Sequence, residues 1–254
     1  MGEAVSVSET ARAGTQSDAT VSVVIPVRDG EALLAEAIDS VLAQTIAVAE
    51  LIVVDDGSSD RTPAVAKAYR RVIYLRQEPA GQAQARNLGV SQASGAYLAF
   101  LDADDLWAAD KLEQQLEAFR ATPKLAAVFA HAIEFYQRDA TGHPIAIGRP
   151  KPAMLPGTML IRQEAFAKVG PFVSERQVGE VIDWYARAVD LSLPMRTLDA
   201  VLLMRRLHGA NLGRRAKDPA TDYLRVLRRI VGRRRADRSQ FRASARYGND
   251  HDRR

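Results

Sequence analysis

Apolar runs alternate with amphipathic segments over the first hundred positions of the chain. The unbroken run VSVVIPV at 21–27 is rich in β-branched residues, which predicts a strand buried on both faces. Apolar positions at helical spacing over 33–42 predict a helix, and a second apolar run at 51–54 predicts the next strand. Together these segments predict a β-α-β unit, from which parallel sheets are built.

The same alternation continues to position 120. Further strands are predicted at 72–75 and 96–101, and helices at 60–69, 82–90 and 111–120. The fold class we expect is therefore α/β: a single domain with a Rossmann-like, mostly parallel central sheet and helices on both faces. Beyond position 120 the alternation stops, and shorter elements follow: strands at 125–136, 159–161 and 201–205, a turn at 141–144, and helices at 163–168 and 178–189.

Composition narrows the classes of protein that fit this pattern. The 254 residues are 47% hydrophobic and 26% charged, as in ordinary globular domains, and no apolar run reaches the roughly 18 residues of a membrane span. Residues 1–20 lack the cationic start and apolar stretch of a secretory signal, so we expect a disordered leader. The absence of cysteine excludes disulfides and thiolate chemistry and is compatible with the cytoplasmic location that we expect.

The basic excess of the chain is concentrated at its end. The net charge is +4, but residues 225–254 hold eleven arginines against three aspartates. A solvated basic helix and tail is the simplest interpretation, and peripheral contact with an anionic membrane is the alternative. We expect no nucleic acid partner.

Asp102-Ala103-Asp104-Asp105 is the strongest chemical signal in the sequence. It directly follows the predicted strand at 96–101, and ligands of parallel sheets bind at the carboxyl ends of strands. Three carboxylates within four residues repel one another unless a cation or water offsets their charge. Their oxygen atoms suit a hard divalent ion, so the cofactor we expect is Mn²⁺ or Mg²⁺.

A second acidic group, Asp55-Asp56-Gly57-Ser58, ends another predicted strand. A carboxylate there can accept a hydrogen bond from the N–H of a nucleotide base, and a turn that caps the next helix is the alternative. Arg86-Asn87 lies near the start of the predicted helix 82–90, which we expect to face the same edge of the sheet. Its guanidinium can pair with carboxylates or phosphate, and a surface salt bridge is the alternative.

These segments together resemble the family 2 glycosyltransferases of the glycosyltransferase A fold. The resemblance is an ordered series of matches that covers positions 21–120: SVVIPVRDG, AIDSVLAQT, VVDDGSSDRT, GQAQARNLGV and GAYLAFLDADDLWAADKLEQQ. It implies a nucleotide-binding half at 21–120 and an acceptor-binding half at 121–216. The remainder, 217–254, is expected to form a C-terminal helix and basic tail.

The resemblance also implies roles for individual residues. Pro26, Arg28 and Asp56 would line the base pocket, Arg86 would support it, Asp102 would reach the ribose, and Asp104 would bind the metal. Ala103, in the same motif, is assigned to the donor site. Trp107 and Lys111 belong to the matched stretch, but we interpret them as an aromatic side chain packed under the loop and a lysine on the helix surface.

The second half matches the family more loosely. In MLPGTMLIRQEAFAKVGPF, Gly157 would approach the donor, as would its neighbour Thr158. In MRRLHGANLGRR, His208 would reach the diphosphate or metal, and Arg206 with nearby arginines would cover the leaving group.

The catalytic base is the point at which the sequence departs from its family. In many relatives the site is Glu-Asp, but here it is Glu180-Val181, with Asp183 further on. Glu180 and Asp183 lie three residues apart on a predicted helix and can share one face, so both are candidates, with Asp183 favoured. The structural alternative is that Glu180 caps the helix while Asp183 pairs with Arg187 on its outer face.

The function expected is a metal-dependent inverting glycosyltransferase. The donor would be a nucleotide-sugar, with UDP favoured because Asp56 can accept the uracil imide N–H. The acceptor would be a saccharide, a small molecule or a peptide. Val181 leaves open a catalytically inactive nucleotide-sugar-binding protein. A nucleotidyltransferase fits less well, because no glycine-rich phosphate loop follows the first strand.

Overall fold

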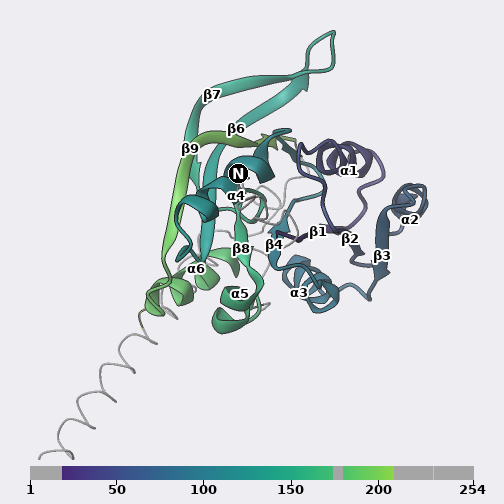
Figure 1. Cartoon of the computed structure of the whole chain (residues 1–254). Helices are drawn as coiled ribbons and strands as arrows, with labels where there is room; N and C mark the ends of the chain where they lie inside the picture. The colour runs from purple at the N-terminus through teal and green to yellow at the C-terminus, as the bar shows by residue number, and fades with distance from the viewer. Residues whose placement is uncertain (1–18, 174–179, 209–230, 232–254) are drawn as a thin grey trace, which may run out of the picture.

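A single mixed sheet organises the molecule (Figure 1). The computed structural model describes residues 19–173, 180–208 and 231. Within them the strands run in the order β3-β2-β1-β4-β8-β6-β9-β5, with β7 paired to β6. The strands are β1 (Val21–Val27), β2 (Glu50–Asp55), β3 (Val72–Arg76), β4 (Tyr97–Phe100), β5 (Leu106–Trp107), β6 (Ala127–Arg138), β7 (Pro144–Ala153), β8 (Leu160–Arg162) and β9 (Met195–Arg206).

Helices cover both faces of this sheet, because successive strand residues point to opposite sides. In β1, Val23 and Ile25 pack into one buried cluster with α1, α2 and α4, whereas Val24 packs into a second cluster with α3, α5 and α6. The helices are α1 (Leu34–Leu42), α2 (Thr62–Lys67), α3 (Gln82–Gln92), α4 (Lys111–Ala121), α5 (Gln163–Val169) and α6 (Glu180–Asp190), with a 3-10 turn, η1 (Pro156–Thr158).

Parallel pairing is concentrated in the first half of the chain. β1 pairs in parallel with β2 and β4, and β2 with β3, so the loops after β1, β2 and β4 leave the same edge of the sheet. Helix α3 can approach β1 closely because Gly89 has no side chain. A Cβ at this position would lie 2.3 Å from Val24 Cγ1. The second half pairs antiparallel, except that β6 and β9 are parallel.

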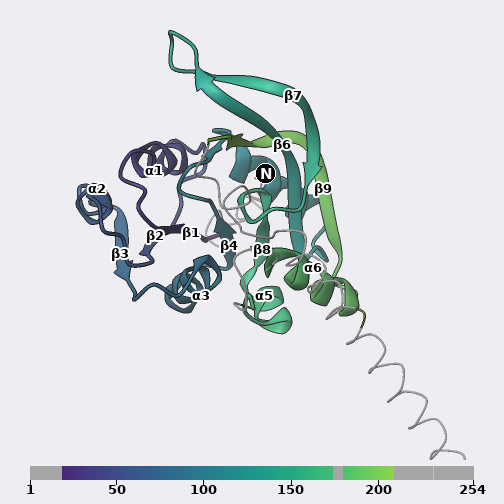
Figure 2. The same ribbon diagram turned by 180° about the vertical axis from the view of Figure 1, so that it is seen from behind.

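The β6–β7 hairpin extends away from the rest of the sheet in both views (Figures 1 and 2). Most residues of β7 are exposed, and the strand contains Pro144, Pro150 and Pro152. Its connecting turn is held by Asp139, whose Oδ1 accepts hydrogen bonds from the backbone N–H groups of Thr141 and His143. Proline cannot donate to a neighbouring strand, so the outer edge of β7 is poorly suited to further pairing.

The expected α/β fold is confirmed, with a sheet that is mixed rather than mostly parallel. Most predicted elements are present within one to three residues of their predicted bounds. Strands β5 and β7 and the first half of β9 were not predicted. Within the described residues, no helix is long and apolar enough to cross a bilayer. The leader at 1–20 lies outside the described residues except for positions 19 and 20, and the tail at 217–254 except for position 231.

Candidate functional site

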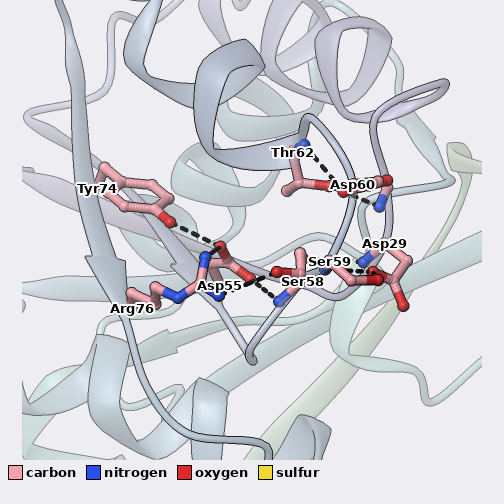
Figure 3. Close-up of polar contacts among 9 residues, drawn as sticks. Asp29, Asp55, Ser58, Ser59, Asp60, Thr62, Tyr74 and Arg76 are labelled. Carbon is pink, nitrogen blue, oxygen red and sulfur yellow. Dashed lines mark hydrogen bonds and ion pairs between the residues drawn. The ribbon is translucent and has the colours of Figure 1, made fainter.

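The loops that follow β1 and β2 are fastened to each other at the carboxyl edge of the sheet (Figure 3). Asp29, with a positive φ of 49°, accepts hydrogen bonds at Oδ1 from the N–H and hydroxyl of Ser59. Its own N–H donates to the Ser58 hydroxyl over 2.9 Å. Both loops are therefore fixed before any ligand arrives.

Asp55 is a structural carboxylate within this edge (Figure 3). It is fully buried and accepts hydrogen bonds from the Ser58 N–H at 2.7 Å, the Tyr74 hydroxyl at 2.6 Å and Arg76 Nη1 at 3.1 Å. Burial alone would raise the pKa of Asp55, but the hydrogen bonds and the arginine charge outweigh it and hold that pKa below its ordinary value.

Asp56 faces the loop before α3. Its carboxylate accepts hydrogen bonds from Gln77 Nε2, the Ala80 N–H and the Gly81 N–H, at 2.7–2.9 Å. An ionised carboxylate offers about four acceptor positions, so this one has capacity for a further donor. That is what hydrogen bonding to a base N–H requires.

Asp102 is oriented by α3. Its Oδ1 accepts hydrogen bonds from Arg86 Nη2 at 2.6 Å and Gln82 Nε2 at 3.0 Å. Arg86 is only 1% exposed, so the surface salt bridge considered as an alternative is wrong, and the ion pair is a buried support for a partly exposed carboxylate. The adjacent Asn87 exchanges two hydrogen bonds with the backbone of Phe172, which locks α3 to the segment after α5.

Asp104 meets His208 across the end of β9. Strand β5 pairs antiparallel with β9, and this pairing brings His208 Nε2 to 2.9 Å from Asp104 Oδ2. Burial raises the pKa of Asp104, and the charge of Asp102 raises it further, against the lowering effect of His208. Burial and then its two acidic neighbours raise the pKa of Asp105 well above the ordinary value, although its Oδ1 accepts the N–H of Arg206.

Arg206 holds the acidic loop, residues 102–105, which follows β4. Its Nε donates to the backbone carbonyl of Asp104 at 3.0 Å, and its Nη2 donates to Glu36 in α1 at 2.7 Å. Glu36 also pairs with Arg138 at the end of β6. Burial acts to raise the pKa of Glu36, but its hydrogen bonds to both arginines hold it below the ordinary value. These contacts give Arg206 a structural task besides the predicted one.

The residues around Asp104 fit a divalent metal ion that takes only some of its ligands from the protein. Within the described residues, no three His, Asp or Glu side chains converge as a complete ligand set. Asp104 and His208 still offer an oxygen and a nitrogen 2.9 Å apart, and Mg²⁺-type ions commonly take one or two protein ligands and complete their shell with phosphate and water. A cation would also relieve the repulsion that raises the pKa values of Asp104 and Asp105.

The other predicted donor residues lie around the same edge. Pro26 is buried in β1 and Arg28 is exposed directly after it, while Ala103 is half-buried in the acidic loop. Gly157 is buried in η1, where its carbonyl accepts a hydrogen bond from Trp107 Nε1 at 2.8 Å. Arg214 and Arg215, two of the nearby arginines in MRRLHGANLGRR, lie outside the described residues.

Two side chains differ from their expected settings. Lys111, expected on the surface of its helix, is completely buried, because it packs over the ring of Trp107. Asp183 is 1% exposed, and its Oδ2 accepts a hydrogen bond from Arg187 Nε at 2.9 Å. Arg187 also donates to the backbone carbonyls of Val169 and Pro171, so the pair belongs to the packing of α6 rather than to its outer face.

Several supporting residues were missed from the sequence: Gln82, Glu36 and Gln115. Gln82 lies one turn before Arg86, so its position in α3 could have suggested a shared partner. Glu36 and Gln115 act on groups that are remote in sequence, and no local pattern reveals such contacts.

Comparison with known proteins decides the family. Residues 22–176 match the sequence model described as Glycosyl transferase family 2, which is more than half of the chain. The chain belongs to this family. A relative from Escherichia coli, the UDP-Glc:alpha-D-GlcNAc-diphosphoundecaprenol beta-1,3-glucosyltransferase WfgD, is 44% identical over 102 residues, covering 39% of this chain and 40% of the relative.

Other relatives are also named glycosyltransferases. The putative teichuronic acid biosynthesis glycosyltransferase TuaG of Bacillus subtilis is 42% identical over 103 residues, covering 38% of this chain and 40% of its own. An uncharacterized glycosyltransferase of Rickettsia felis is 45% identical over 103 residues, covering 39% of this chain and 17% of its own. The matched segment thus spans less than half of these relatives.

The fold of the family 2 chain is also found in solved structures. It resembles S. aureus TarS 1-349 in complex with UDP-GlcNAc with a TM-score of 0.69 and 21% identity, over 83% of this chain and 65% of that one. At this identity the likeness establishes the fold, a single α/β domain of glycosyltransferase A type.

Proposed function

We propose that this family 2 chain transfers a sugar from a nucleotide-sugar, with UDP as the favoured nucleotide, to a saccharide acceptor. The carrying observation is the acidic loop after β4, in which Arg86 orients Asp102 while Asp104 and His208 lie 2.9 Å apart. Asp56, at the end of the nearby β2, has capacity for a base N–H. The names of relatives that use UDP-glucose or bind UDP-GlcNAc support the same nucleotide.

Asp104 and His208 would hold Mn²⁺ or Mg²⁺ in this proposal. The bound ion would neutralise charge on the donor diphosphate as that group leaves. Asp102 would accept a hydrogen bond from the ribose while Arg86 keeps its carboxylate in place. Charge on the leaving nucleotide is then met by groups that are already oriented, which is the usual source of electrostatic catalysis.

The reaction proposed is a single displacement with inversion. An acceptor oxygen forms a bond to the anomeric carbon while the bond from that carbon to the diphosphate breaks, and the electron pair of that bond leaves with the nucleotide. The acceptor proton passes to a carboxylate of the protein.

We place that base at Glu180, the first residue of α6, rather than at Asp183. The buried ion pair between Asp183 and Arg187 supports the structural alternative for Asp183, since a carboxylate so enclosed is poorly placed to meet an incoming acceptor. Val181 cannot take a proton. Turnover in Glu180→Gln and Asp183→Asn separates the two, and normal turnover in folded Glu180→Gln would remove it from the mechanism.

The experiment that tests the function is a screen of UDP-, GDP- and TDP-sugars with and without Mn²⁺. We expect a UDP-sugar to raise the melting temperature more with Mn²⁺ than without it, since a ligand that binds only the native state stabilises it. Slow release of nucleoside diphosphate and free sugar would support transferase chemistry. Pyrophosphate release would support the nucleotidyltransferase instead, and binding without any product would support the inactive binding protein suggested by Val181.

A further inference from the structure

Lys111 occupies a setting that is costly for a cation. It opens α4, where the positive end of the helix dipole disfavours positive charge, and its side chain is wholly buried. Its Nζ donates a hydrogen bond to Gln115 Oε1 at 2.7 Å and lies 4.1 Å from the centroid of the Trp107 ring. Contacts this specific indicate that the lysine arranges its two neighbours.

Both neighbours hold a backbone carbonyl of η1. Trp107 Nε1 donates to the Gly157 carbonyl at 2.8 Å, and Gln115 Nε2 donates to the Thr158 carbonyl at 2.7 Å. Gln115 Nε2 also donates to the Val128 carbonyl at 3.0 Å, so both of its amide hydrogens are engaged. The buried Oε1 of Gln115 then needs a donor of its own, and Lys111 supplies one.

The opposite side of η1 is closed by β9. A Cβ on Gly157 would lie 2.9 Å from Leu203 Cδ1, so the turn rests directly on that side chain. Leu203 is also the register partner of Trp107 in the β5–β9 ladder. Strand β5 begins immediately after Asp105, and β9 ends at Arg206, which binds the same loop. The buried contacts therefore join η1 to the acidic loop.

We propose that Lys111 is a positioning residue that holds η1 in register with the acidic loop. By doing so it strengthens binding of the sugar part of the donor more than binding of the nucleotide part. The inference rests on the proposed function and on the family resemblance, which implies that Gly157 approaches the donor. Lys111 itself touches no substrate. It acts through Trp107 and Gln115, whose donated hydrogen bonds set where the η1 backbone lies.

The test compares binding of UDP with binding of UDP-glucose and UDP-GlcNAc by calorimetry, in Mn²⁺, using the full chain. In Lys111→Met we expect the affinity for the preferred UDP-sugar to fall about tenfold, as when one well-placed hydrogen bond is lost, while UDP affinity stays within about twofold. Lys124→Met, at an exposed lysine just after α4, is the matched control and should change neither. Equal falls in the affinities for UDP and for the UDP-sugar would overturn the inference.

A milder variant keeps the inference testable in case Lys111→Met does not fold. Trp107→Phe keeps an aromatic ring under Lys111 but removes the N–H that holds Gly157, and it should separate UDP-sugar from UDP binding in the same direction. Unchanged preference for the UDP-sugar in either folded variant overturns the role of Lys111 alone. Failure of the wild-type chain to bind UDP or either UDP-sugar overturns the proposed function, and this inference with it.

Discussion

The two acidic clusters at the carboxyl edge of the sheet are balanced in opposite ways. At the end of β2, Asp55 and Asp56 each accept three hydrogen bonds from the protein, and the pKa of Asp55 is lowered. After β4, burial and mutual repulsion raise the pKa values of Asp104 and Asp105. The first cluster is stabilised by its own surroundings, whereas the second would gain from an added cation.

The largest effect expected from this difference is in Asp104→Asn. The variant should lose the Mn²⁺-dependent part of UDP binding, and turnover should fall at least about 10²-fold, because the leaving diphosphate is no longer neutralised. Its free energy of unfolding should be unchanged or higher, since a repelled carboxylate has been removed. Calorimetry with and without Mn²⁺, together with urea unfolding, measures both effects.

Asp110→Asn is the matched control for that variant, because Asp110 is exposed and lies just before α4. It should leave metal-dependent binding unchanged. Metal dependence that survives in Asp104→Asn would move the metal site elsewhere and break the comparison.

The corresponding variant in the first cluster is Asp55→Asn. It should lower the free energy of unfolding by about 2–3 kcal/mol, because the neutral amide leaves Tyr74 and Arg76 without their charged acceptor. Metal-dependent UDP binding by the folded variant should persist. Denaturant unfolding at constant pH gives the energy, and loss of metal-dependent binding at full stability would contradict the structural role.

The contribution of Asp55 to stability should also depend on pH. The folded-state pKa of Asp55 lies below its ordinary value of 3.8, so its stabilising contribution is present above pH 3.8. The contribution is lost as pH falls through the folded-state pKa. The stability difference between wild type and Asp55→Asn should therefore shrink below pH 3.8, and a constant difference there would contradict the assigned cause.

The smallest effect concerns a cation near the second cluster. Burial favours the neutral form of Lys111, as it does for Asp104 and Asp105. It lowers the pKa of Lys111 to about 7, from 10.5. Between these values the unfolded chain binds more protons than the folded one, so stability rises with pH. Relative to Lys111→Met, wild type should gain about 1 kcal/mol from pH 7 to 8, as measured by urea unfolding. A flat difference would contradict burial of the charge.

Periodicity predicted the first half of the sheet because its strands are apolar on both faces. It missed β7, whose three prolines argue against a strand, and β5, which has only two residues. In the site, the motifs predicted Asp102 and Asp104, and the family resemblance connected them with His208. The burial of Lys111 and the pairing of Asp183 with Arg187 depend on packing between distant segments, which local sequence does not record.

The β6–β7 hairpin has a practical consequence for work on this protein. The backbone hydrogen bonds of the turn around Asp139 run within it, between 139 and 143, and the turn forms the far end of the hairpin in Figure 1. Insertions are best tolerated at exposed turns whose ends stay close together. A fluorescent reporter or affinity peptide placed between Thr141 and Gly142 should therefore leave donor binding intact, which makes this tip a convenient handle for immobilising the protein or following it in cells.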